Sequence, residues 1–298
     1  MSLVIVGSIA LDTVETPFGK VNEVPGGSSI YASMASRYFC KTKIVGVVGE
    51  DYPTDILLLL NDNDICTQGV EFSKGKTFRW KGIYHDLKQA ETLDTQLNVF
   101  ADFDPQIPEN YKNAEFVFLG NIDPALQLKV LDRMKNPKIT ACDSMNFWIT
   151  GKKEKLINVI KRVDILFINE DELKMFTGEK NIYKAAEIME IYNLKLLVIK
   201  LGEYGALALN KDLFFFTPVY PLKKVIDTTG AGDCFAGGFM GYLAGQGKFD
   251  EMTIRNAMVY GTIMASFNIQ DFSIEGLKNI TKQEIRDRKE KIKRSVFF

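Results

Sequence analysis

Short runs of apolar residues alternate with amphipathic stretches along the chain. The runs are LVIVG, KIVGVVG, EFVFLG, KITAC, DILFIN, KLLVIKLG and ALALN, and helical periodicity occupies residues 28–39, 125–135, 153–161, 183–192 and 251–267. The early runs are apolar at nearly every position, which is typical of strands buried on both faces of a sheet. Alternating strands and helices predict βαβ units, and therefore an α/β fold with a mostly parallel sheet.

Two segments interrupt this alternation, at residues 13–24 and 76–100. Both have the pattern of exposed, partly alternating strands, and both contain turn residues, among them Pro17, Gly19 and Gly82. We interpret them as an appended antiparallel layer within one domain that spans residues 1–298.

Composition excludes several classes of protein. The chain has 298 residues and a net charge of −1, so it can bury a large core and nothing indicates a nucleic-acid partner. No apolar run reaches the length of about 18 residues that a membrane span requires. The first apolar run begins at Leu3 without a preceding signal peptide, and the four cysteines form no CxxC pair, so we expect a cytoplasmic protein without a zinc site.

The chain has a single histidine, His85, in the polar stretch YHDLKQ. A general base is therefore expected to be a carboxylate, unless His85 serves.

Polar residues follow the predicted strands. In open parallel sheets, ligands bind beyond the carboxyl ends of the strands, where these residues would meet. Each one alone could equally be a helix cap or part of an Asx turn. The residues are Gly7, Ser8 and Asp12, then Gly49, Glu50 and Asp51, Asp143 and Asn146, Asn169 and Glu172, Gly202 and Gly205, and finally Asp227.

The stretch IDTTGAGDCFAGGF is the most specific signal. We predict that Ile226 ends a strand, that residues 228–232 form a tight turn, and that Asp233 lies in the first turn of the next helix. Glycines and a helix N-terminus together make an anion site. A carboxylate beside an anion site is what phosphoryl transfer to an alcohol needs.

The alternative is an ordinary helix cap with glycines for packing. Gly237, Gly238 and Gly241 would then mark close contact with a neighbouring element, because glycine costs about 1 kcal/mol in a helix interior. The GxxxxGK[ST] motif is absent, and Phe235 stands where a dinucleotide fingerprint needs a small residue.

DTTGAGDCFAGGF resembles the C-terminal signature of the ribokinase-like (PfkB-type) carbohydrate and nucleoside kinases. The resemblance covers nearly the whole chain, through GSIALD, a Gly-Gly pair opening a helix, VGVVGED, NEDE and KLGEYGA in the family's order. It implies a three-layer αβα fold with a small β-sheet lid, formed by the two irregular segments, over the sugar site. In this family the lid often also forms a homodimer.

The resemblance also implies roles for individual residues. Asp233 would be the general base, and Gly230, Ala231 and Gly232 would form the anion hole. ATP would be the phosphate donor. Residues matching the nucleotide side of the family are Asn169, Lys200, Gly202, Gly205, Thr228, Asn256 and Gly261.

Asn169 and Glu172 match the family's NxxE motif, so Glu172 would organise Mg²⁺, mainly through water. Asp12 would bind substrate hydroxyls, with Gly26 and Gly27 bordering the sugar.

Several departures narrow the interpretation. Tyr31 stands where ribokinases carry an asparagine that holds ribose, and Lys200 replaces a common threonine. SFNIQDF replaces the loop that completes the monovalent-cation site in ribokinase, but Asp227 is kept, so potassium activation stays open.

DSMNFW, with Asp143 and Asn146, is similar to a stretch of acid-sugar kinases that approaches substrate and phosphate. Arg79 is then a candidate clamp for a substrate carboxylate, or simply a solvated surface residue.

The sequence therefore predicts an ATP-dependent kinase that phosphorylates a hydroxyl of a sugar or sugar-like substrate. A nucleoside kinase of the same family is the alternative. A third interpretation, a sugar or nucleotide sensor without catalysis, is opposed by the retention of Asp233, Asn169 and Glu172.

Overall fold

A central sheet crosses the molecule, and the computed structural model describes it within residues 1–296. Neighbouring strands pair in parallel across most of this sheet, and two strands join it antiparallel at one edge. The predicted mostly parallel sheet is confirmed. In spatial order it consists of β13 (Phe214–Thr217), β12 (Ala206–Leu209), β11 (Leu196–Lys200), β10 (Ile165–Asn169), β9 (Ile139–Cys142), β8 (Phe116–Leu119), β1 (Ser2–Val6), β4 (Lys41–Gly49) and β5 (Ile65–Ser73).

The central strands are buried on both faces. In β1, Leu3 and Ile5 point into one apolar core, and Val4 and Val6 point into the other. This is why the strand has no polar alternation. The chain adds β4 and β5 on one side of β1 and then β8 to β11 on the other, so the sheet has a switch point between β1 and β8.

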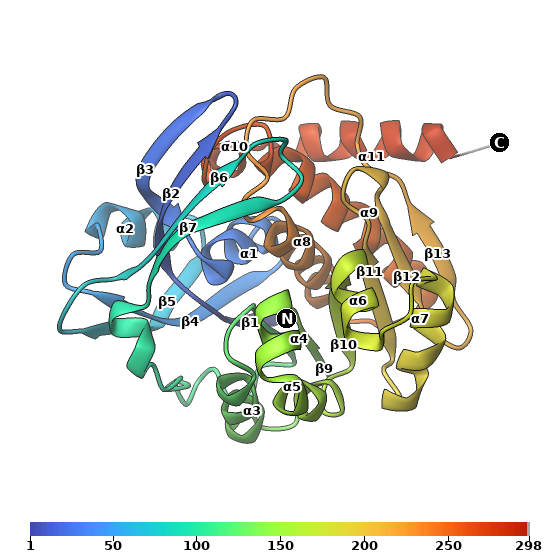
Figure 1. Ribbon diagram of the computed structural model, residues 1–298, viewed down its shortest axis with the longest axis horizontal. Helices are drawn as coiled ribbons and strands as arrows, with labels where there is room; N and C mark the ends of the chain where they lie inside the picture. The colour runs from blue at the N-terminus through green and yellow to red at the C-terminus, as the bar shows by residue number, and fades with distance from the viewer. Residues whose placement is uncertain (297–298) are drawn as a thin grey trace.

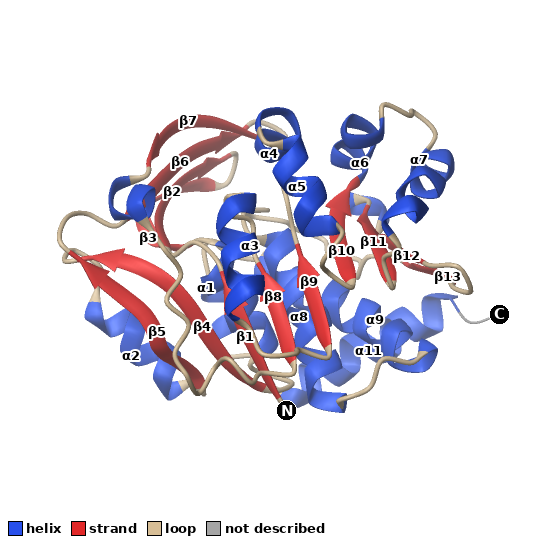
Figure 2. Ribbon diagram, turned by 90° about the horizontal axis from the view of Figure 1, so that it is seen from below, coloured by secondary structure: helices blue, strands red, loops and turns tan. Residues whose placement is uncertain are grey.

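Helices cover both faces of the sheet and complete three layers (Figure 2). One face carries α1 (Ser28–Ser36), α2 (Thr54–Asp62), α8 (Ala231–Gln246), α9 (Glu251–Asn268), α10 (Glu275–Lys278) and α11 (Lys282–Val296). The other face carries α3 (Pro124–Arg133), α4 (Asn146–Gly151), α5 (Lys153–Ile160), α6 (Glu170–Thr177) and α7 (Ile182–Met189). Short 3₁₀ helices are η1 (Asn98–Asp102), η2 (Glu190–Tyr192) and η3 (Gly202–Tyr204). None of the helices within residues 1–296 is long and apolar enough to cross a membrane.

A second sheet, which we call the lid, lies beyond the carboxyl ends of β1 and β5 (Figure 1). It consists of β3 (Gly19–Gly26), β2 (Ala10–Thr16), β6 (Phe78–Tyr84) and β7 (Ala90–Gln96) in that order. Both predicted segments contribute to it, but the expected antiparallel layer needs correction, because β2 and β6 pair in parallel. These strands follow β1 and β5, which are themselves parallel, and so leave the main sheet in the same direction.

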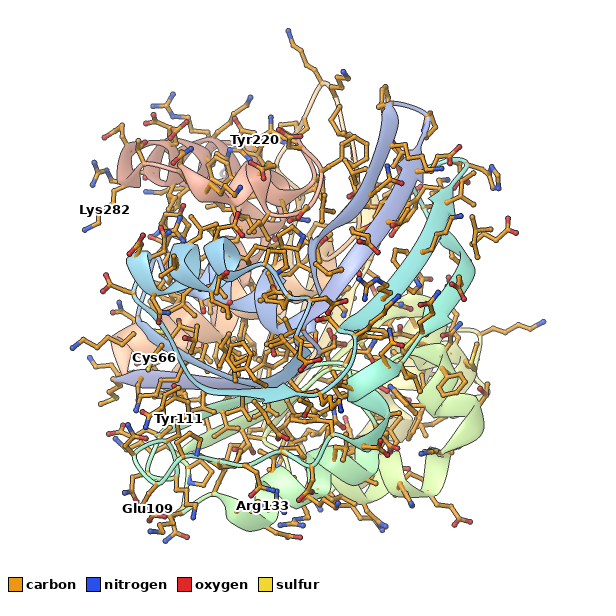
Figure 3. The ribbon with its side chains drawn as sticks, turned by 90° about the vertical axis from the view of Figure 1, so that its left-hand side faces the viewer. Cys66, Glu109, Tyr111, Arg133, Tyr220 and Lys282 are labelled. Carbon is orange, nitrogen blue, oxygen red and sulfur yellow. The ribbon has the colours of Figure 1, made fainter. Side chains whose placement is uncertain are left out.

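The segment that connects the lid back to the main sheet, between β7 and β8, is held to β5 and α3 by side-chain contacts. The Tyr111 hydroxyl donates to the Cys66 carbonyl at 3.0 Å, and Figure 3 shows the two residues close together. Arg133 of α3 pairs with Asp104 at 2.8 Å.

The glycines inside α8 lie against neighbouring helices, Gly237 and Gly241 against α1 and Gly238 against α9. A Cβ on Gly237 would stand 2.2 Å from the Ala32 carbonyl oxygen, and one on Gly241 would stand 2.7 Å from Ser36 Cα. The expected close contact with a neighbouring element is confirmed.

The prediction that a strand ends at Ile226 is wrong. Residues 219–228 form an extended loop with no regular structure, and the Ile226 amide donates to the Ile269 carbonyl at 2.8 Å instead of to a strand. Ile226 therefore lies near the end of α9 and not in the main sheet.

Candidate active site

The loop before α8 has the geometry of an anion site. Gly230 is the N-cap residue of α8 and has a φ of 72°, a left-handed conformation that favours glycine. The Tyr31 ring lies on it, only 2.3 Å from where a Cβ would be. Asp233 is in the first turn of α8, as predicted, and no side chain of the described residues caps this helix. A purely capping role for Asp233 therefore has no support.

The carboxylates of Asp12, Asp227 and Asp233 lie near one another beside this loop, in a region that we call the acceptor space. The Asp12 carboxylate lies under the chain at Gly26, where a Cβ would be 1.9 Å from its Oδ2. Burial, and then the charges of Asp227 and Asp233, raise the pKa of Asp12 to about 8. Burial also raises the pKa of Asp227, and burial with the charge of Asp143 raises that of Asp233 to about 7. At neutral pH Asp12 is therefore largely protonated and Asp233 partly protonated, because the three groups cannot all carry a negative charge in this space.

Tyrosines line the same space. The Tyr31 and Tyr52 hydroxyls are buried without a partner among the described residues. The Tyr84 hydroxyl, from the lid, lies 3.2 Å from Thr229 Oγ1. Burial and the charge of Asp12 raise the pKa values of all three tyrosines. Carboxylates and unpaired hydroxyls together match the hydroxyl groups of a small substrate.

Lys200 places a positive charge next to the anion site. Its ammonium bonds both oxygens of Asp143, at 2.7 and 3.0 Å. It also stands 3.2 Å from where a Cβ on Gly232 would be. Burial acts to lower the pKa of Lys200, but the charges of Asp143 and Glu172 outweigh burial and raise it. Lys200 is therefore charged at neutral pH.

Asn169 and Glu172 form a capping box at the start of α6. Asn169 Oδ1 accepts from the Glu172 amide at 2.8 Å, and Glu172 Oε2 accepts from the Asn169 amide at 2.9 Å. Burial raises the pKa of Glu172 to about 7; Lys200 opposes the shift and Asp143 adds to it.

One Glu172 oxygen makes no bond within the described residues. Residues 1–296 hold no cluster of three or more candidate metal ligands. Asn169 and Glu172 together offer one carboxylate oxygen without a partner in this part of the chain, and they therefore fit a metal that is held mainly by water and by a phosphate ligand.

Two buried acceptors flank Thr229. Asp227 Oδ2 and Asn268 Oδ1 have no partner in the described residues. They are free to accept a monovalent cation or water. The Asn268 amide donates to the Thr229 carbonyl at 2.8 Å, so that carbonyl is already engaged.

Other predicted site residues lie around this centre. Gly27, with a φ of 93°, caps α1 beneath the lid. Asn146 is exposed at the start of α4, and Gly202, in open space, begins η3. Gly205 lies at the end of η3, where a Cβ would stand 2.0 Å from the Thr217 carbonyl.

Two predicted residues on α9 make contacts within the protein. The Asn256 amide donates to the Met252 carbonyl at 2.8 Å, and a Cβ on Gly261 would lie 2.8 Å from the Phe235 carbonyl. Gly261 therefore serves helix packing, and a nucleotide-binding role for either residue stays a prediction.

Arg79 is not a free clamp. It pairs with Glu23 at 2.7 Å and with Asp51 at 2.8 Å, and its side chain is 17% exposed. Two carboxylates already neutralise it, which leaves little capacity for an acidic substrate. His85 also lies apart, 70% exposed and paired with Glu91 of the same hairpin.

Sequence reasoning missed the contribution of Tyr84 and Tyr52 to the site, and it missed the ion pair between Lys200 and Asp143. The signal for Tyr84 was available, because an aromatic residue directly before the turn of an exposed hairpin has no packing partner in the hairpin itself. The ion pair depends on β9 and β11 lying two positions apart, which no sequence pattern gives.

The sequence is similar to known kinases. The sequence is 33% identical over 257 residues to cytidine kinase from Thermococcus kodakarensis, covering 83% of this chain and 90% of that protein. It is 26% identical over 269 residues to probable fructokinase-2 from Arabidopsis thaliana, covering 78% of this chain and 79% of that protein.

Solved structures share the fold. Methanocaldococcus jannaschii nucleoside kinase superposes with a TM-score of 0.79 at 19% identity, covering 97% of this chain and 98% of that one. Fructokinase from Vibrio cholerae, with fructose, ADP and calcium ion bound, also gives a TM-score of 0.79, at 20% identity, covering 96% and 98%. The sequence matches the family described as pfkB family carbohydrate kinase over residues 2–276, and the chain therefore belongs to that family.

Proposed function

We propose that the chain is an ATP-dependent nucleoside kinase, which transfers the γ-phosphoryl group of ATP to a hydroxyl of the ribosyl group. The observation that carries phosphoryl transfer is the meeting of three features at the start of α8: the Asp233 carboxylate, the Lys200 ammonium and the backbone donors of the glycine loop. The similarity to a cytidine kinase over most of its length favours a nucleoside.

The charges of the site favour a neutral acceptor. Burial and mutual repulsion already disfavour negative charge on Asp12, Asp227 and Asp233, so a further carboxylate is disfavoured there, and Arg79 is neutralised by its two partners. An acid sugar would have to bind against these carboxylates without a cation of its own. We therefore do not propose an acid-sugar kinase.

Asp233 is suited to be the general base. A pKa of about 7 is close to the optimum for proton transfer at neutral pH. Asp233 accepts the proton of the substrate hydroxyl as that oxygen attacks the γ-phosphorus, and the bond from this phosphorus to the bridging oxygen of ADP breaks. Lys200 and the amides of Gly230, Ala231 and Gly232 then stabilise the charge on the transferred group.

Magnesium is part of this proposal. When bound, Mg²⁺ neutralises the phosphates of ATP. Glu172 would hold it through water, with the oxygen that the capping box leaves free. Glu172→Ala should therefore need more Mg²⁺ for half-maximal activity, and identical Mg²⁺ titrations for variant and parent would contradict this role.

The test of the function is ATP turnover against a panel of nucleosides and neutral sugars. We expect phosphorylation of at least one pyrimidine nucleoside, with an acid sugar inactive. The second candidate, a sugar kinase, is favoured by the fructokinase relatives and would appear as preferential turnover of a hexose or pentose. Binding without turnover of any acceptor would indicate a sensor.

We also propose that two copies pair through their lids. The outer strand β7 is exposed along most of its length, and Leu93 on it is 47% exposed. An open edge strand with apolar residues favours pairing with a second copy. Light scattering at micromolar concentration should show a dimer for the parent and a monomer for Leu93→Lys. A monomeric parent would contradict the proposal.

A further inference from the structure

Both threonines of the glycine loop make hydrogen bonds to the lid. Thr228 Oγ1 donates to the Leu87 carbonyl at 2.9 Å, and Thr229 Oγ1 lies 3.2 Å from the Tyr84 hydroxyl. Leu87 is in the turn between β6 and β7, which Figure 1 shows reaching over the start of α8. An anion site built from backbone amides needs neither hydroxyl, so these side chains have another task.

Thr229 is held from three directions. Its amide donates to Asp227 Oδ1 at 2.9 Å, its carbonyl accepts from Asn268, and its hydroxyl meets the lid. The next residue, Gly230, has the left-handed conformation that turns the following amides toward the anion site. A group that moves Thr229 therefore changes where those amides point.

The two hairpins of the lid are attached differently. The β2–β3 hairpin is fixed to the body by the Ser273 hydroxyl, which donates to the Pro25 carbonyl at 2.5 Å. The turn of the β6–β7 hairpin adds to its threonine contacts only an exposed pair within the described residues, Lys88 with Glu203 at 3.7 Å. Such a pair contributes little to stability. β6 is held in the lid by its pairing with β2, and the threonine hydroxyls and Tyr84 hold the turn of this hairpin against the glycine loop.

We propose that Tyr84 is a positioning residue for phosphoryl transfer, which acts through Thr229, and that Thr228 and Thr229 link closure of the β6–β7 hairpin to the phosphate-binding loop. This inference rests on the proposed function. Tyr84 is buried between the lid and the loop, on the side of Asp12 and Asp227. Closure of the lid over the acceptor and alignment of the backbone donors then occur together, and water is kept from replacing the acceptor.

The first test is Tyr84→Phe, which keeps the ring and removes the hydroxyl. Loss of one hydrogen bond should lower kcat by about 3- to 10-fold. ATP hydrolysis without acceptor should rise relative to transfer, and the KM for ATP should change little. His85→Ala is the matched control, because His85 is in the same turn but pairs only within the hairpin, and it should keep parental kinetics.

Thr229→Val should reproduce the effect of Tyr84→Phe. The double variant should lose no more than either single variant, because both remove the same contact. A double variant whose losses multiply, or a Tyr84→Phe enzyme with parental kcat and parental hydrolysis, would overturn the proposal.

A second measurement does not depend on activity. Amide hydrogen exchange at residues 85–96 should become faster in a Thr228→Val, Thr229→Val double variant, with exchange in β1 and β10 unchanged. Unchanged exchange in the turn would refute the link even if the enzyme were active. Conversely, faster exchange in a protein that phosphorylates no acceptor would support the link while the proposed function fails.

Discussion

At the scale of single residues, Asp233 carries the reaction that we propose. Asp233→Asn keeps the shape of the side chain and removes proton acceptance. Because a general base contributes about 10² to 10⁴ in rate, kcat should fall by at least about 10². ATP affinity, measured by calorimetry, should change little, since the backbone donors remain.

Asp171→Asn is the matched control for Asp233→Asn, because Asp171 is an exposed acid in the first turn of another helix. It should keep parental kcat. A near-parental kcat for Asp233→Asn would refute the base assignment, and an unfolded variant would restore the structural interpretation.

The pH dependence of the reaction depends on Lys200. The proposed base must be ionised, so kcat/KM should rise with pH through about 7 and level off above it. Lys200 lowers the pKa of Asp233, so Lys200→Met should move this rise to higher pH. It should also lower kcat by about 10²- to 10³-fold, as loss of an oxyanion donor does.

Two variants complete the test of Lys200. Asp143→Asn combined with Lys200→Met avoids an unpaired buried carboxylate. It also removes the Asp143 charge that raises the pKa of Asp233, so its pH profile should lie at lower pH than that of Lys200→Met alone. Lys195→Met, just before the same strand but at its opposite end, should change nothing. A pH profile that is the same in Lys200→Met and in the double variant would contradict the electrostatic role.

The positions of residues could be predicted from sequence where a local pattern fixes the geometry. A glycine loop that opens a helix places Asp233 and Gly230 whatever the rest of the chain does. Arg79 shows the limit, because its partners Glu23 and Asp51 come from other segments, and only the folded lid brings them together.

At the scale of elements, the helix starts were the easiest part to predict. The helices expected from residues 28, 125, 153, 183 and 251 all begin within one residue of those positions. The predicted strand at Ile226 failed because a short apolar run has the same pattern whether it joins a sheet or packs under a helix end. The parallel pairing of β2 and β6 could not be predicted, since it depends on where two other strands end.

The contact between α8 and α1 predicts an effect on stability. In Gly241→Ala the new methyl group would lie 2.7 Å from Ser36 Cα, so the helices must separate. Such overpacking costs about 1 to 3 kcal/mol, partly offset by the better helix propensity of alanine. We expect a lower Tm by calorimetry, with kcat preserved at low temperature.

Gly151→Ala is the control, because nothing lies within 4 Å of its added methyl group. Its Tm should be unchanged or slightly raised. Equal Tm values for the two variants would show that α1 and α8 tolerate separation.

At the scale of the whole molecule, the buried Asp12 carboxyl lowers the free energy of unfolding at high pH. The pKa of Asp12 is raised to about 8 in the folded protein, against 3.8 as the ordinary value. Between about pH 4 and pH 8 the Asp12 carboxyl holds a proton in the folded protein that it has lost in the unfolded chain. The free energy of unfolding therefore falls as pH rises toward about 8. Asp12→Asn should therefore be more stable than the parent at pH 8, and the difference should shrink toward pH 4.

Urea unfolding across this pH range measures the effect of Asp12→Asn, and kinase activity should be lost in the same variant. A difference in stability that is constant with pH would show that Asp12 is not protonated in the folded protein. The three-layer fold itself was predictable, because strands buried on both faces require helices on both sides.

The packing of α1 against α8 also sets the order of events during synthesis. The Cys234 thiol of α8 lies 3.6 Å from the Tyr31 carbonyl of α1, across a separation of 203 residues. At about 5 to 20 residues per second, the ribosome needs roughly 10 to 40 s to make the partner of α1. All nine residues of α1 are buried in the finished protein, so the nascent chain carries its apolar residues, such as Ile30, Tyr31 and Met34, without the cover of α8 during this interval. The nascent protein is thus a natural client for chaperones until α8 leaves the exit tunnel.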